Sequence, residues 1–159
     1  MKTTTLLVLV AVAFMTVQAD QQGFEPRVGM IMFLSKAFRI SLLDTEKCVN
    51  KTGASIDDLA QLEQDVNEAT YDCTKASTRR MTCAMVCCAH IQGSMVNGTI
   101  NMPFVNNLIT ESGMPESALA VLVPIFHWCH DRVKLLTDAC DVGCIFLECM
   151  VANTKYIGM

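Results

Sequence analysis

The sequence is poor in basic residues, in aromatic residues and in long apolar runs. Its 159 residues include 12 Lys and Arg against 16 Asp and Glu, so the formal net charge is −4 at pH 7. Nucleic-acid binding needs clustered Lys and Arg, and the only basic cluster is KASTRR, so no nucleic-acid partner is expected. After the N-terminal segment the strongest apolar run, ALAVLVPIFHWC, is short and contains Pro124. We therefore expect no stable membrane insertion.

The N-terminal segment has the layout of a secretory signal peptide. Lys2 precedes an apolar run over residues 6–17, and small residues follow up to Ala19. This run is too short to span a membrane. We predict a signal peptide at residues 1–19 and a secreted, extracellular domain at residues 20–159. The alternative is that the segment forms a buried N-terminal helix.

The apolar spacing indicates an all-α domain of about six helices. No β-type alternation persists, whereas apolar residues recur at steps of three and four, as on one face of a helix. Ser55 is a predicted N-cap, because Asp57 and Asp58 follow it where they suit the helix dipole. Residues 66–77 are polar and predict a loop, and NGTINMP at residues 97–103 predicts a turn. The predicted helices lie at about residues 28–48, 52–64, 78–95, 103–110, 115–133 and 137–151.

All nine cysteines follow the signal segment, and in a secreted chain this number predicts a disulfide framework. Because nine is odd, at least one thiol is free or joins another chain. Cys83 and Cys87 are four residues apart on one predicted helix, so they share a face and cannot easily bond each other. Each is expected to join a different element to this helix. A zinc site is the competing hypothesis, and it needs a second close pair of ligands, for instance in HWCHD.

Six of the cysteines have a spacing that resembles a known family. They are separated by 34, 3, 41, 10 and 8 residues, and the segments CVNKTGAS, NGTIN and CDVGCIFLEC fit the same pattern. Over essentially all of residues 20–159 the chain resembles the insect odorant-binding proteins, which include the pheromone-binding proteins. The resemblance implies a compact fold of about six α-helices around an apolar cavity, with three interlocked disulfides. Carried onto this chain, the disulfides are Cys48–Cys87, Cys83–Cys140 and Cys129–Cys149.

The chain departs from the family pattern at two points. The interval between Cys48 and Cys83 is longer than usual, and Cys73, Cys88 and Cys144 are additional. Two of these three thiols suffice for a fourth bridge, which leaves one thiol free or bonded to another chain. Cys88 and Cys144 also fit a second interpretation as small core residues.

The resemblance implies a carrier, without enzymatic activity, cofactor or metal, that binds small hydrophobic odorants or pheromones reversibly. It also implies delivery to a membrane chemoreceptor, and we expect a monomer or a weak homodimer. The inward helix faces predict the ligand-lining residues, and eleven Met residues suit a cavity that adapts to varied ligands. The predicted lining is Phe33, Leu59, Met81, Met85, Leu108, Met114, Leu119, Leu122, Val123 and Phe126, with Tyr156 and Ile157 of the tail as a lid.

Several alternatives stay open. The stretch CCAH is similar to the active site of secreted phospholipases A2, but one residue too few precedes His90 and no Asp follows it. No Gly-rich calcium loop precedes the stretch either. His90, His127 and His130 suggest a pH switch for ligand release. The other functional hypotheses are a non-olfactory carrier with the same fold and a protein-interaction module that uses the spare thiol.

Overall fold

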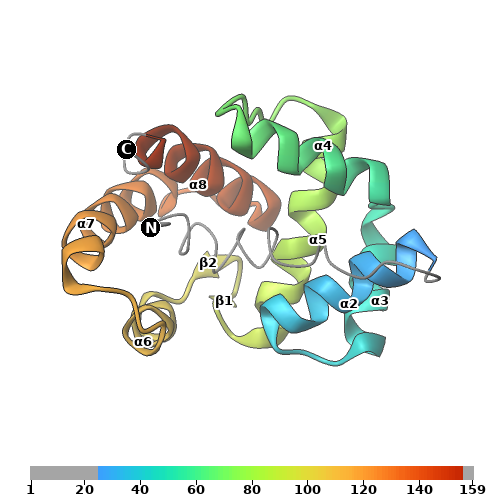
Figure 1. Ribbon diagram of the computed structural model, residues 1–159, viewed down its shortest axis with the longest axis horizontal. Helices are drawn as coiled ribbons and strands as arrows, with labels where there is room; N and C mark the ends of the chain where they lie inside the picture. The colour runs from blue at the N-terminus through green and yellow to red at the C-terminus, as the bar shows by residue number, and fades with distance from the viewer. Residues whose placement is uncertain (1–24, 156–159) are drawn as a thin grey trace.

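The computed structural model describes residues 25–155, so the predicted signal peptide lies outside the described residues. This part of the chain is almost entirely helical, with one short hairpin (Figure 1). Its helices are α2 (Pro26–Phe38), α3 (Leu42–Thr52), α4 (Ile56–Asn67), α5 (Ala76–Gln92), α6 (Met102–Glu111), α7 (Glu116–Val133) and α8 (Ala139–Thr154). The strands are β1 (Met95–Val96) and β2 (Thr99–Ile100). The predicted all-α class is confirmed, with seven helices over residues 25–155 instead of about six.

The additional helix arises because the predicted helix at residues 28–48 is two helices. Arg39 ends α2 in the left-handed conformation, at φ 53°. Ser41 then begins α3, and its hydroxyl accepts a hydrogen bond from the amide of Asp44 at 3.0 Å. A side chain that caps a helix start competes with continuation of the preceding helix. The prediction of one helix across this stretch was therefore wrong.

The start of α4 is held by a capping box and by an ion pair between its buried Asp58 and Arg80 of α5. The predicted N-cap at Ser55 is confirmed, because its hydroxyl accepts from the Asp58 amide and the Asp58 carboxylate accepts from the Ser55 amide. Arg80 of α5 donates twice to the same carboxylate, at 2.7 and 3.0 Å. These hydrogen bonds lower the pKa of Asp58 below its ordinary value.

The hairpin replaces the turn predicted at residues 97–103 and connects α5 to α6. Asn97 and Gly98 occupy its two-residue loop with positive φ values of 51° and 77°. Asn-Gly is the dipeptide that tolerates this conformation best, and it matches the twist of the two flanking strands. Met95 pairs with Ile100 across the hairpin. The hairpin turns the chain back so that α6 lies opposite the end of α2.

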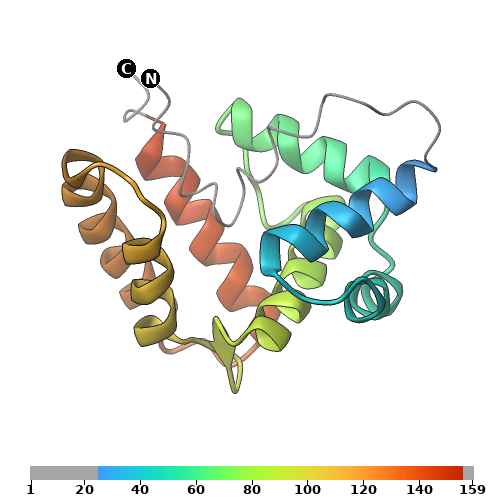
Figure 2. The ribbon, with the colours of Figure 1, turned by 60° about the horizontal axis from the view of Figure 1, so that its bottom comes forward.

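Helix α5 is the centre of the domain. It packs against α2, α3, α4 and α8, and α7 packs on the far side of α8 (Figure 2). Met81, Ala84 and Cys88 of α5 are fully buried. Helix α6 is held more loosely, because Ile109 is its only buried residue. The space between α6 and the core is where the cavity described below lies.

Candidate ligand-binding cavity

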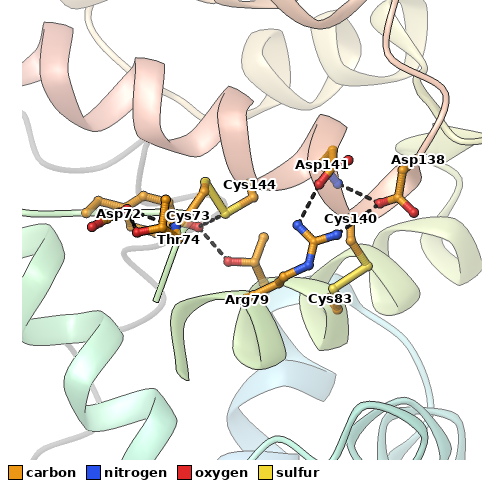
Figure 3. Close-up of a disulfide and its surroundings, with 11 residues drawn as sticks. Asp72, Cys73, Thr74, Arg79, Cys83, Asp138, Cys140, Asp141 and Cys144 are labelled. Carbon is orange, nitrogen blue, oxygen red and sulfur yellow. Dashed lines mark hydrogen bonds and ion pairs between the residues drawn. A yellow bond between two sulfur atoms is a disulfide. The ribbon is translucent and has the colours of Figure 1, made fainter. Parts of the chain in front are cut away.

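Four disulfides form a covalent frame around the helices. Three are the pairs that the family resemblance implies: Cys48–Cys87, Cys83–Cys140 and Cys129–Cys149. The fourth joins Cys73, in the loop before α5, to Cys144 of α8. Figure 3 shows this bridge and Cys83–Cys140 side by side between α5 and α8. Two of the three additional cysteines thus belong to the frame.

Cys83 and Cys87 join α5 to two different helices, as their spacing predicts. Cys83 is bonded to α8 and Cys87 to α3. An ion-pair cluster supports the contact with α8, because Arg79 lies at 2.5 Å from Asp141 and 3.5 Å from Asp138 (Figure 3). Helices α5 and α8 are therefore joined both by a disulfide and by an ion-pair cluster.

Cys88 is the one cysteine of residues 25–155 without a disulfide, and its side chain is completely buried. Burial raises its pKa from an ordinary 9.0 to about 12. The thiolate is the reactive form, so this thiol is inert in the folded protein. A covalent dimer through Cys88 would require the core to open, so the structure gives the protein-interaction hypothesis no exposed thiol.

The buried thiol makes alkylation a direct test of this arrangement. At pH 8 under non-reducing conditions, native protein should resist iodoacetamide, whereas the denatured chain should take up one equivalent. Above pH 9 the unfolded chain ionises at Cys88 and the folded chain does not until about pH 12. Stability should therefore fall with rising pH in this window, and less so in Cys88→Ala. Labelling of native protein at the denatured rate, or uptake of three equivalents, would contradict the structure.

A cavity of about 130 Å³ lies between the end of α2, the second half of α5, the hairpin, α6, α7 and α8. A water-sized group needs about 10–15 Å³ on this measure, so the cavity has room for about ten such groups. Its wall is mainly apolar, and Phe126 and Phe146 meet there edge to face, with ring centroids 4.8 Å apart. The apolar lining comprises Ala37, Phe38, Met85, Val86, Ala89, Met95, Ile100, Val105, Leu108, Ile109, Phe126, Gly143, Phe146 and Leu147.

The predicted lining residues lie in several places. Met85, Leu108 and Phe126 line the cavity. Phe33, Met81 and Leu122 are buried in the core and do not line it. Partly buried positions packed against the core are occupied by Leu59, Met114, Leu119 and Val123. Tyr156 and Ile157 lie outside the described residues.

Sequence reasoning predicted no residue of α8 or of the hairpin as a cavity wall. Gly143, Phe146 and Leu147 of α8 line the cavity, as do Met95 and Ile100 of the hairpin. The signal in α8 was its apolar character on all sides between its cysteines, which is typical of a helix covered on more than one face.

The one hydroxyl deep in the wall already has a partner. Thr82 lines the cavity, and its hydroxyl lies 2.5 Å from the phenol oxygen of the buried Tyr71. Burial raises the pKa of Tyr71 above its ordinary value, so the phenol stays neutral. The interior of the cavity therefore carries no charge, and its charged residues, Arg39 and Glu111, are exposed at the rim.

The three histidines are not part of the cavity wall. His90 and His127 are exposed, and His130 is half-buried on α7. The cavity wall therefore contains no histidine that would support the pH-switch hypothesis.

Residues 25–155 also contain no group of three His, Cys, Asp or Glu side chains placed to hold a metal ion. Over the same residues, no helix has both the length and the apolar character needed to cross a membrane.

Comparisons of the chain with protein-family models, with curated proteins and with solved structures found no match.

Proposed function

We propose that this protein is a secreted carrier that binds small hydrophobic ligands reversibly in the cavity between α5, α6 and α8. The observation that carries the proposal is the apolar cavity itself, whose interior has no charged group and no set of candidate catalytic side chains. The cysteine spacing supports it, because it resembles that of the insect odorant-binding proteins. On this proposal the ligands are odorants or pheromones that the protein brings to membrane chemoreceptors. A non-olfactory carrier would use the same cavity, so only the tissue of expression separates the two.

The size of the cavity sets the expected affinity. A chain of ten methylene-sized groups gains about 8 kcal/mol from leaving water, at ~0.8 kcal/mol each. Association costs at least about 4 kcal/mol, so the apolar contacts alone give a Kd near 1 mM, because 1 mM corresponds to about 4 kcal/mol. A micromolar Kd needs about 8 kcal/mol in total. Polar contacts at the rim are therefore expected to matter for tight ligands.

Displacement of a fluorescent apolar probe tests the proposal. Alcohols, esters, aldehydes and fatty acids of about ten carbons should displace the probe, and much larger ligands should not. Leu108→Trp should weaken probe binding at least about tenfold, because the larger side chain fills the cavity from α6. Asn107→Trp is the matched control, since this exposed neighbour on the same helix does not line the cavity. Failure of every ligand class to displace the probe, or an equal effect of both variants, would refute the carrier function.

A further inference from the structure

The rim of the cavity carries one positive and one negative residue. Arg39 follows the last residue of α2, and Glu111 is the last residue of α6. Neither side chain makes an ion pair or hydrogen bond within the described part of the chain, whereas Arg79, Arg80 and Lys75 are all paired with carboxylates there. A charged group at the mouth of an apolar cavity is placed to contact the polar end of a ligand whose apolar end lies inside.

Arg39 occupies a backbone position that does not suit arginine. It has φ 53° and ψ 42°, in the left-handed region. The amides of Arg39 and Ile40 donate to the carbonyls of Lys36 and Ser35, at 3.3 and 3.1 Å, which is the Schellman pattern that ends a helix. Glycine is the usual residue there, because a side chain makes the left-handed conformation costly. Backbone strain at a site that lines a cavity supports a functional role for the side chain.

The position of Arg39 is also held from both sides. Leu34 and Phe38 before it are buried in the core, and Phe38 lines the cavity as well. After it, Ile40 is fixed by two hydrogen bonds: its backbone N–H donates to the Ser35 carbonyl, and the Ser35 hydroxyl donates to the Ile40 carbonyl at 2.6 Å. Glu111 lacks such support, because α6 has a single buried residue. The backbone that carries the Arg39 side chain is thus better fixed than that of Glu111, which reduces the ordering needed when a ligand binds there.

We propose that Arg39 selects ligands that end in a carboxylate, with an apolar chain of about ten carbons inside the cavity. This inference rests on the carrier function proposed above. The guanidinium group presents several N–H donors in a fixed plane that matches the two carboxylate oxygens. The carboxylate stays at the open rim, where its other lone pairs remain in water, and the chain extends past Phe126 and Phe146.

Three ligands with the same ten-carbon chain test the head-group preference by probe displacement at pH 7: decanoate, decan-1-ol and decylamine. The intact, disulfide-bonded protein should bind decanoate about tenfold more tightly than decan-1-ol, as expected for a charge-assisted hydrogen bond. Arg39→Gln should remove this preference and leave decan-1-ol binding nearly unchanged. Glu111→Gln is the control for loss of a rim charge, and it should not weaken decanoate binding.

A second variant separates the loss of charge from a loss of folding. Arg39→Gly relieves the left-handed strain, so it should unfold at a higher temperature than the wild type while losing the preference for decanoate. Equal binding of decanoate and decan-1-ol by the wild type would overturn the inference and leave the carrier function intact. A preference for decylamine that Glu111→Gln abolishes would also overturn it. If none of the three ligands displaces the probe, the carrier function itself fails.

Discussion

Gly143→Ala is expected to destabilise the protein, although alanine is the better helix former. Gly143 lies in α8 where that helix crosses α5, and a methyl group added to it would overlap the Cγ2 atom of Val86. Val86 is β-branched and lies within a helix, where one χ1 rotamer is strongly preferred, so its methyl group turns away only at a cost. Overpacking of this kind lowers the free energy of unfolding by about 1–3 kcal/mol. The higher helix propensity of alanine raises it by about 1 kcal/mol. The net loss in the free energy of unfolding should therefore be up to about 2 kcal/mol.

A double-mutant cycle identifies the cause of that loss. If Val86 is the obstacle, Gly143→Ala should become neutral or stabilising by up to about 1 kcal/mol in a Val86→Ala background. Chemical denaturation of the four proteins measures this coupling. Ala152→Gly, at an exposed position of the same helix, calibrates the propensity contribution. Additive effects of Gly143→Ala and Val86→Ala would show that the close approach of α5 and α8 at this point is wrong.

The helices are predictable from the sequence because their signals are local. Apolar residues at steps of three and four mark the inward faces, and Ser55 with Asp58 marks the start of α4 within four residues of sequence. The break between α2 and α3 was missed because Ile40, Leu42 and Leu43 continue the apolar character of the preceding residues. Leu42 and Leu43 are in fact 54% and 61% exposed, so their apolar character does not report burial.

The cavity is less predictable because it depends on how the helices pack. Met81 and Met85 are one turn apart on α5 and both are buried, yet only Met85 lines the cavity. The inward face of a helix does not tell which of its residues meet other side chains and which meet an empty space. No sequence pattern indicated that Arg39 lies at the cavity rim, because this position depends on where α2 ends, and that end was not predicted.

The fourth disulfide shows how one bridge depends on another. Cys73 and Cys144 are 71 residues apart in sequence. The Cys83–Cys140 bridge shortens the covalent path between them, which runs along the chain from residue 73 to 83, across that bridge, and on from 140 to 144. The closed loop therefore contains about 15 residues, for which the chain-entropy model gives about 3 kcal/mol. Without Cys83–Cys140 the loop closed by Cys73–Cys144 contains about 70 residues, and the same model gives a stabilisation of more than 4 kcal/mol.

Removal of the fourth bridge in Cys73→Ala/Cys144→Ala is accordingly expected to lower the free energy of unfolding by about 3 kcal/mol. In a Cys83→Ala/Cys140→Ala background, removal of the same fourth bridge should cost about 1 kcal/mol more than in the wild type, because the loop that it closes is then longer. Urea denaturation under non-reducing conditions measures both differences, and Cys88→Ala controls for loss of a buried sulfur outside the frame. The family-like frame of three bridges already restricts the chain on either side of Cys144. A loss well below 1 kcal/mol in the double variant would mean that those three bridges alone hold the loop before α5 against α8.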